Sequence, residues 1–312
     1  MRRVVQIVDS IEYVRSNCYQ RQLLDGLERA CAGGLVTIPV GVLGSAEAQK
    51  LLPTADRIVS CMRQRTLDQR RNEVSRAIGD RLLVVYDQDP WEAFRPGSSC
   101  VGAYSRICAA LNVDRFAVTT MSWVPRLQRL GFKSSFVPMG ILPGVCSNSP
   151  TPAERPSLVG FVGAMHPYRV ALFERLERAG IHVDLVPGGL THDAYLAALS
   201  RIAVFVHRET LTFDVAGEQV DLAEGLWVKD IEAMGRGCIS VRNHDDHADE
   251  HMPRDAMTRN LRMYRDLDHA VEVVKIAVND IARRDHATET SECVNLIRDD
   301  DAWFKAAVCI VA

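Results

Sequence analysis

The sequence predicts an α/β protein with two Rossmann-like βαβ domains that face each other across a cleft. Short runs rich in Val and Ile alternate with helical patterns along the chain, as in parallel sheets covered on both faces. The 312 residues suffice for two domains of about 150 residues. Near the midpoint, the Pro- and Ser-rich stretch VCSNSPTPAERPS interrupts the pattern, as an interdomain linker does.

The first half holds five strand patterns and one clear helix pattern. The helix pattern, NCYQRQLLDGLERACAG, is amphipathic and runs into two glycines, which commonly end helices. The strands are short apolar runs bounded by polar residues or turn signals. In chain order they are RVVQIVDS, RIVSCM, RLLVVYDQDP, RFAVTTM and SSFVPMG.

After the linker the alternation restarts. Strands are predicted in SLVGFVGAM, IHVDLVPGG, IAVFVH and CISV, and helices in PYRVALFERLERAG, THDAYLAALSR, residues 227–234 and DHAVEVVKIAVNDIARRD. We therefore expect a first domain over 1–146, a linker over 147–157, a second domain over 158–285 and a tail over 286–312. Packing of the tail on the first domain is one arrangement we consider.

Composition favours a soluble globular protein, with 47% hydrophobic and 25% charged residues. No apolar run approaches the roughly 18 residues of a membrane span, and the apolar run near the N-terminus is too short for a signal peptide. Nine cysteines lack CxxC pairs and zinc spacing, which favours free thiols in a reducing cytoplasm. We expect a cytoplasmic monomer or homodimer.

The net charge of −3 argues against a general nucleic-acid binder. One local exception is the arginine cluster of residues 63–81, which Asp68 and Glu73 partly compensate. A solvated helix face is the simpler interpretation, and a site for a phosphate-rich acceptor is the alternative.

Two glutamates, Glu224 and Glu232, stand eight positions apart in EGLWVKDIEAMGRGCISV, across the start of a predicted helix. A glutamate near a helix N-terminus can simply complement the helix dipole. A carboxylate there can also accept hydrogen bonds from both hydroxyls of a ribose, and a second carboxylate one loop earlier suits a further polyol. The pair is therefore a candidate sugar-binding feature.

This segment resembles the C-terminal domain of GT-B glycosyltransferases of the family 1-4-like group, which often carry a glutamate, seven residues and then EAM-x-x-G. The chain as a whole resembles the CgeB-like branch more closely. The features that carry this resemblance are FVG at 161–163, PYR at 167–169, Lys229 three positions before Glu232, and the D-x-D-P stretch at 87–90.

The resemblance implies transfer of a hexosyl or pentosyl group from a nucleotide-diphosphate donor such as a UDP-sugar, without a metal ion or cofactor. It also implies that the domain over 1–146 is the acceptor side and that the domain over 158–285 binds the nucleotide sugar. The implied donor-binding residues are Gly163, Arg169, Lys229, Glu224, Glu232 and His207.

Physical reasoning on the same residues agrees with donor binding. Gly163 permits close backbone approach to a diphosphate, and the helix that begins at Pro167 offers N–H groups to the same anion. Arg169 and Lys229 are cationic groups for the leaving diphosphate. The chain departs from the pattern of many retaining GT-B enzymes, because Ala164 follows the glycine where they carry an arginine, and both stereochemical outcomes stay open.

An inverting reaction needs a general base from the first domain. Asp89, at the end of a predicted strand, is our first candidate, Asp87 the second and Asp9 the third. A turn or helix cap at Asp89-Pro90 is the non-catalytic alternative. His166 would assist the leaving group or bind the donor sugar, or would be an ordinary polar loop residue.

Two polar loops complete the candidate features. The loop from His207 to Gly225 is long enough to contact the base or sugar or to act as a lid. The stretch NHDDHADEH, residues 243–251, has no distinctive ligand spacing, so we interpret it as a solvated acidic loop and predict no metal site.

The acceptor stays open between a small metabolite, a polysaccharide, a protein and a hydroxymethylated DNA base. Two other functions share the same features. One is a non-catalytic nucleotide-sugar-binding regulator, and the other is a GT-B-shaped enzyme that processes the sugar nucleotide, such as an epimerase.

Overall fold

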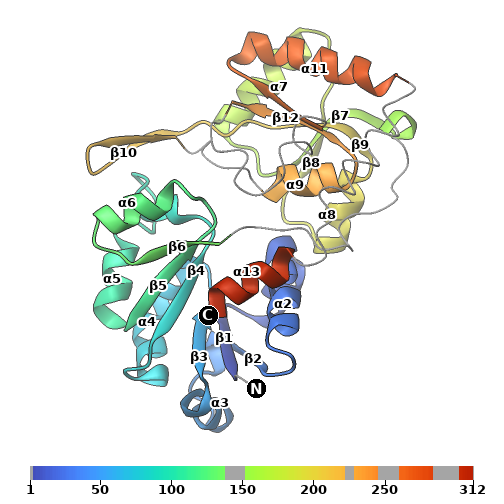
Figure 1. Cartoon of the computed structure of the whole chain (residues 1–312). Coiled ribbons are helices and arrows are strands. Elements are labelled where there is room, and N and C mark those ends of the chain that lie inside the picture. The colour runs from blue at the N-terminus through green and yellow to red at the C-terminus, as the bar shows by residue number, and fades with distance from the viewer. Residues whose placement is uncertain (1–2, 138–151, 222–227, 245–259, 284–301, 312) are drawn as a thin grey trace. The chain divides into compact units, whose positions relative to one another are not determined.

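The computed structural model describes residues 3–137, 152–221, 228–244, 260–283 and 302–311 (Figure 1). The chain forms two compact units. The first unit comprises Met1–Met139, Phe213–Val220 and Trp303–Ala312, and the second comprises Gly140–Thr212 and Asp221–Ala302.

The first unit is built on a six-stranded parallel sheet with the strand order β2-β1-β3-β4-β5-β6. The direction of strand addition reverses between β1 and β3, and ligands of such sheets bind at the carboxyl ends of the strands beside this reversal. Strands β1 and β4 are buried throughout, as central strands must be. The strands are β1 Val4–Val8, β2 Leu35–Pro39, β3 Arg57–Ser60, β4 Leu83–Asp87, β5 Val113–Val118 and β6 Ser134–Phe136.

Helices accompany this sheet in the first unit. Side-chain caps begin several of them: Ser10, Asn17 and Ser45 each accept a backbone N–H of the first turn. The helices are α1 Ile11–Ser16, α2 Cys18–Ala30, α3 Ala46–Leu51, α4 Gln64–Ile78, α5 Ala103–Ala110, α6 Trp123–Arg129 and α13 Ala302–Val311.

Two segments distant in sequence join the first unit. The guanidinium of Arg115 donates to the carbonyls of Cys309 (3.0 Å) and Ile310 (3.3 Å), so a cation holds the negative end of α13. The hairpin of β10 (Thr212–Val215) and β11 (Glu218–Asp221) is fixed through Glu218, which accepts from Arg126 Nε at 2.9 Å and pairs with Arg129.

The second unit has a five-stranded parallel sheet with the order β13-β12-β9-β7-β8. Here the direction reverses between β7 and β9, so the loops that follow these two strands border the expected ligand position. The strands are β7 Ser157–Gly163, β8 Asp184–Pro187, β9 Ile202–Val206, β12 Ile239–Asn243 and β13 Leu261–Tyr264, and the helices are α7 Pro167–Arg178, α8 His192–Leu199, α9 Val228–Gly235 and α11 Leu267–Ile281.

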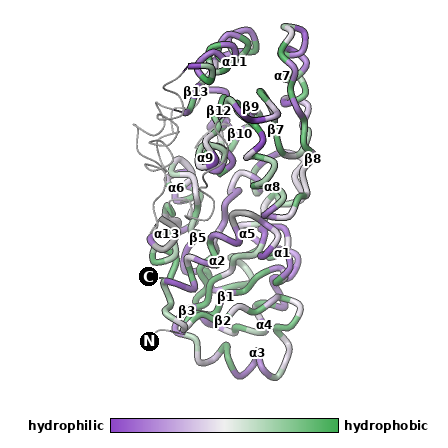
Figure 2. Tube along the Cα trace, turned by 90° about the vertical axis from the view of Figure 1, so that its right-hand side faces the viewer, coloured by the Kyte–Doolittle hydropathy of each residue, from purple (hydrophilic) through white to green (hydrophobic). Residues whose placement is uncertain are grey.

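Helix α11 shows why the sequence pattern is readable. Its hydrophilic and hydrophobic residues alternate along the turns (Figure 2), with Ala270, Val274 and Ala277 among the buried ones. Every strand and helix predicted above is present, and the α/β class with parallel sheets is confirmed. Strands β2 and β13, the β10–β11 hairpin and helices α1, α3, α5, α6 and α13 were not predicted. The described residues contain no helix with the length and apolar character of a membrane span.

Candidate functional site

The last residue of β7, Gly163, has a backbone conformation and close neighbours that require glycine. Gly163 has φ of 147°, and a Cβ atom there would lie 3.0 Å from the Phe161 ring. The following loop also packs closely on the loop after β8, because a Cβ atom on Gly188 would lie 3.1 Å from the backbone nitrogen of Ala164. The loop that begins α7 is thus held tightly at its origin.

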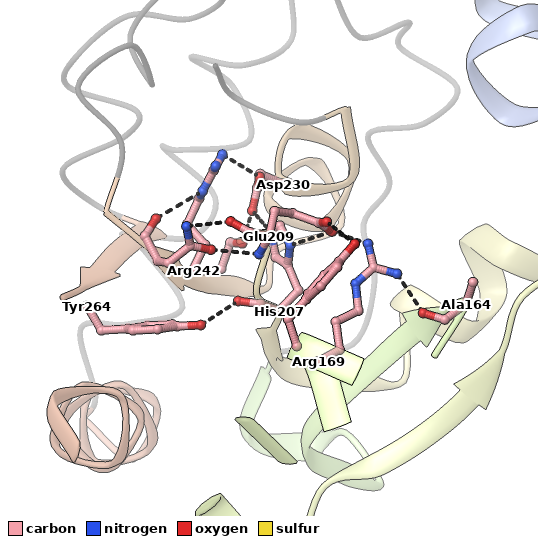
Figure 3. Close-up of polar contacts among 10 residues, drawn as sticks. Ala164, Arg169, His207, Glu209, Asp230, Arg242 and Tyr264 are labelled. Atoms are coloured by element: carbon pink, nitrogen blue, oxygen red, sulfur yellow. Dashed lines mark hydrogen bonds and ion pairs between the residues drawn. The ribbon is translucent and has the colours of Figure 1, made fainter. Parts of the chain in front are cut away.

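Arg169, in the first turn of α7, points its guanidinium toward Ala164 of this loop (Figure 3). Its side chain is 3% exposed, donates to the carbonyl of Ala164 at 2.5 Å and forms an ion pair with the fully buried Glu209. We predicted a cation for a diphosphate at this position. The structure places the guanidinium inside the unit, where it joins the β7 loop to the segment after β9.

Glu209 is fixed through both its backbone and its side chain. The Asn243 side chain accepts from the Glu209 N–H and donates to its carbonyl, both at 2.8 Å. The Tyr168 hydroxyl donates to the carboxylate at 3.0 Å. Burial alone would raise the pKa of Glu209, but the adjacent His207 ring and the charges of Lys229 and Arg169 lower it to about 2.

A second buried carboxylate, Asp230, lies in the first turn of α9. It accepts from Nε2 of His207 at 2.7 Å, from the Ser240 hydroxyl at 2.6 Å and from Arg242 at 3.2 Å. Burial opposes ionisation of this group, but the charges and hydrogen bonds of these partners hold the pKa of Asp230 well below its usual range.

His207 connects the two carboxylates. Its Nε2 bonds Asp230, and its Nδ1 lies 3.6 Å from Glu209, too far for a direct hydrogen bond. Within the described part of the chain, Nδ1 has no hydrogen-bond partner. The Tyr264 hydroxyl donates to the His207 carbonyl at 3.0 Å, so the backbone of this histidine is also fixed.

The remaining predicted donor-side residues have different surroundings. Lys229 is half-buried on α9, and its ammonium nitrogen lies 5.7 Å from the centre of the Phe161 ring, next to Gly163. Glu232 is 1% exposed and is the fifth residue of α9, deeper in the helix than we predicted. The exposed His166 is the N-terminal cap residue of α7 and stacks on Tyr168.

The structure therefore brings Gly163, Arg169, Lys229 and His207 together at the carboxyl ends of β7 and β9. Glu224 lies outside the described residues, as does most of the histidine-rich stretch 243–251. Among the described residues, no group of three or more His, Cys, Asp or Glu side chains is arranged to hold a metal ion.

In the first unit, Asp87 ends β4 and is buried. Its carboxylate accepts three hydrogen bonds, from Gln64 Nε2 at 2.7 Å, from the Tyr104 hydroxyl at 2.9 Å and from the backbone N–H of Asp89 at 3.0 Å. Burial still raises the pKa of Asp87 above its ordinary value. This carboxylate is held in one orientation.

Asp89 has fewer donors. The bond to its carboxylate from Gln88 Nε2 is long, at 3.3 Å, and the Trp91 side chain is a second donor. Burial, and then the adjacent charge of Asp87, raise the pKa of Asp89 to about 7. A carboxyl group that titrates near neutral pH has the proton affinity that a general base needs. Asp9, the third candidate, is occupied by Arg63 and Thr66.

A pocket of about 490 Å³ lies at the carboxyl ends of β3 and β4, next to the strand reversal of the first sheet. Asp87 and Asp89 line it, together with Tyr86, the segment 62–65 and Arg95. The two predicted carboxylates therefore line the same pocket, and each accepts hydrogen bonds from neighbouring side chains.

The arginine cluster of residues 63–81 is largely paired. Arg70 bonds Glu73, Arg71 bonds Asp68, and Arg81 donates to the carbonyls of Pro53 and Ala55. These contacts agree with the simpler interpretation of a solvated helix face.

Sequence reasoning missed the buried partners of the predicted residues: Glu209, Asp230, Arg242, Asn243, Gln64 and Tyr104. The sequence did carry a signal for two of them. Asn243 ends a buried strand and Glu209 follows another by three residues, and side chains converge at this edge of a parallel sheet. No comparable signal marks Gln64 and Tyr104, which reach Asp87 from two different helices.

The chain matches no known family model and no curated protein sequence. It is similar to solved structures over nearly its whole length. An alpha-glucosyltransferase in complex with UDP-glucose and DNA containing an abasic site has a TM-score of 0.62 at 10% identity, with 98% of each chain covered. WaaG, a glycosyltransferase involved in lipopolysaccharide biosynthesis, has a TM-score of 0.60 at 14% identity, over 98% of this chain and 99% of that one. HepE of Anabaena, in complex with UDP and glucose, has a TM-score of 0.57 at 12% identity, over 99% and 97%. The chain therefore has the GT-B fold of these glycosyltransferases.

Proposed function

We propose that the protein is a glycosyltransferase that moves a sugar from a nucleotide diphosphate, best represented by UDP, to a hydroxyl acceptor. The observation that carries this proposal is the arrangement at the carboxyl ends of β7 and β9. There the tight loop after Gly163 leads into helix α7 and lies next to Lys229. The buried pairs Arg169–Glu209 and His207–Asp230 hold this region in place. The resemblance in fold to proteins solved with UDP or UDP-glucose supports it.

In this proposal the diphosphate binds at the N-terminus of α7. The N–H groups of the first turn carry partial positive charge, and Gly163 lets the backbone approach the phosphates. Lys229 stabilises the charge that builds on the leaving diphosphate, so protein groups do the work that a divalent cation does elsewhere. Arg169 contributes indirectly, because it holds the carbonyl of Ala164 and thus the shape of the loop.

The glutamates take the hydroxyl-binding role. Glu232, and Glu224 on the preceding segment, accept hydrogen bonds from hydroxyls of the donor. The burial of Glu232 restricts it to a ligand group that enters the unit beside α9. Asp230 of the same helix is bonded to His207 and Arg242, which fixes α9 to the sheet.

The acceptor binds in the first-unit pocket. In an inverting reaction, the acceptor oxygen forms a bond to the anomeric carbon of the donor while the bond from that carbon to the phosphate oxygen breaks. The nucleotide diphosphate leaves with the bonding electrons, and Asp89 takes the acceptor proton. Asp87, saturated by three donors, positions the backbone of Asp89 and does not take the proton.

A panel of UDP-, GDP- and dTDP-sugars tests the proposal through calorimetric binding and release of the free nucleotide. We expect UDP-sugars to bind and to be turned over in the presence of a chelator. Absence of binding to every donor would overturn the proposal. Analysis of the product anomer then distinguishes inversion from retention.

A further inference from the structure

Buried polar atoms of the first-unit pocket lack a hydrogen-bond partner among the described residues, including Gln64 Oε1, Tyr86 OH and Arg95 Nε. Each belongs to a side chain that lines the pocket, and Tyr86 itself is only 2% exposed. Folded proteins rarely leave such atoms unpaired, because a buried donor or acceptor without a partner costs free energy. Their grouping in one pocket indicates that a ligand supplies the missing partners.

The chemistry of the three atoms restricts that ligand. Gln64 Oε1 accepts, Arg95 Nε donates, and the Tyr86 hydroxyl does both. A ligand that satisfies all three must offer donors and acceptors close together. Neighbouring hydroxyl groups of one compact molecule do so, because each hydroxyl has both functions.

The charges of the pocket indicate a neutral ligand. Arg95 is bonded by both oxygens of Glu92 at 3.1 and 3.2 Å, and Arg63 is paired with Asp9 at 3.0 Å. Asp87 and Asp89 add further negative groups to the lining. A phosphate or carboxylate on the ligand would therefore meet two arginines that are already neutralised, and would meet two additional carboxyl groups against the single charge of Arg65.

The same facts argue against a nucleic-acid acceptor. Nucleic-acid binding draws its affinity from basic side chains that neutralise phosphates. Of the basic side chains in the pocket lining, Arg63 and Arg95 are already paired with acidic groups of the chain, which leaves Arg65 as the lining cation for a phosphate. Arg70 and Arg71, farther along α4, are paired as well. The pocket volume, about 490 Å³, is that of a small-molecule site.

We propose that the first-unit pocket binds a neutral polyhydroxylated acceptor, a saccharide or simple glycoside, through Gln64, Tyr86 and Arg95, and presents one of its hydroxyls to Asp89. This inference rests on the proposed glycosyl transfer and names the acceptor class for that reaction.

The test uses the full chain without donor and follows binding by ligand-observed NMR. The probes are methyl glycosides of glucose, galactose and mannose, with myo-inositol and a hydroxymethylated DNA duplex in separate samples. We expect at least one neutral polyol to bind. Tyr86→Phe should weaken that binding about three- to tenfold, the equivalent of one lost neutral hydrogen bond. Arg95→Lys, which keeps the charge and removes Nε, should weaken it similarly.

Tyr195→Phe is the matched control, because it removes a hydroxyl from α8 in the second unit and should leave polyol binding unchanged. A second readout separates binding from structure. Since the Tyr86 hydroxyl has no partner in the described structure, Tyr86→Phe should keep or raise the midpoint of thermal unfolding while it weakens binding.

Three results would overturn the inference. They are binding of the DNA duplex alone, failure of all the neutral polyols to bind, and polyol binding that neither pocket variant weakens. Titration with UDP-sugars keeps this test separate from the proposed function. A protein that binds a UDP-sugar but no polyol refutes only the acceptor class, whereas one that binds no nucleotide sugar refutes the glycosyl transfer itself.

Discussion

The backbone N–H of Asp89 donates to the carboxylate of Asp87 at 3.0 Å, and the two carboxyl groups line one pocket. The pair divides its roles through its hydrogen bonds. Asp87 is held by three donors, whereas Asp89 has two, Gln88 and Trp91, and the bond from Gln88 is long. Of the two carboxyl groups, Asp89 is therefore the one that is free to accept a proton from a bound ligand.

Replacement of Asp89 by asparagine tests this division. Asp89→Asn keeps the size of the side chain and removes the base, so we expect kcat for transfer to fall about 10²- to 10⁴-fold with little change in donor affinity. Initial rates with saturating UDP-sugar measure it. Asp25→Asn, which breaks a surface pair with Arg21, is the control and should keep full activity. Full activity of Asp89→Asn would contradict the assignment.

The pH dependence of activity and stability follows from the same carboxyl group. Since the pKa of Asp89 is raised to about 7, kcat should rise with pH and level off above that value. The folded protein also retains, between about pH 4 and pH 7, a proton that the unfolded chain has released. The contribution of this group to the free energy of unfolding therefore declines as pH rises through that window.

Asp89→Asn removes the titrating group and with it the decline in the free energy of unfolding between about pH 4 and pH 7. Relative to the wild type, the variant should be more stable at pH 8 than it is at pH 5, as measured by urea unfolding at both values. A stability difference that does not change with pH would show that Asp89 titrates at its ordinary value.

The buried pair of Arg169 and Glu209 should behave as one unit. Glu209→Gln leaves the guanidinium buried without its counter-charge, so we expect a loss of about 3–5 kcal/mol in the free energy of unfolding. Adding Arg169→Met to that variant should cost much less than the sum of the two single changes. Urea unfolding of the three variants completes the cycle.

An exposed ion pair supplies the comparison. Glu73→Gln breaks the pair with Arg70 on α4 and should cost under about 1 kcal/mol, because solvent screens such pairs. Strict additivity of the Arg169 and Glu209 changes would contradict the coupling that the structure implies.

Gly163→Ala tests the loop that begins α7. Alanine is strained at φ of 147°, and its Cβ would contact the Phe161 ring at 3.0 Å, so the loop must shift. We expect weaker binding of UDP by at least several-fold and lower thermal stability. Gly41→Ala, at a site with no heavy atom within 4 Å of the new Cβ, should change UDP binding little. Equal UDP affinity in both variants would remove the loop from the binding site.

The sequence was sufficient for the fold because each sheet consists of buried, β-branched strands separated by amphipathic helices, as β1, β7 and α11 illustrate. Strand β2, whose residues are mostly only half-buried, lies at the edge of its sheet, as does β13. Helix α13 lies in a stretch that we assigned to the C-terminal tail. Edge strands and such segments carry weaker periodic signals, which is why they were not predicted.

The candidate site was less accessible to sequence reasoning. Strand-end positions marked Gly163, Asp87 and Asp89, because position along the chain fixes which residues follow a strand. The burial of Arg169 by Glu209 could not be predicted, since the two residues are 40 positions apart and meet only when β7 and β9 pair. Hydrogen-bond partners of this kind depend on tertiary contacts.

Titration of UDP and UDP-sugars into the wild-type protein and into Lys229→Met tests the central claim most directly. We predict saturable binding to the wild type and roughly 10- to 100-fold weaker binding to the variant, because the proposed site has Lys229 in a charge-assisted contact with the diphosphate. No measurable binding of any nucleotide diphosphate to the wild-type protein would contradict it.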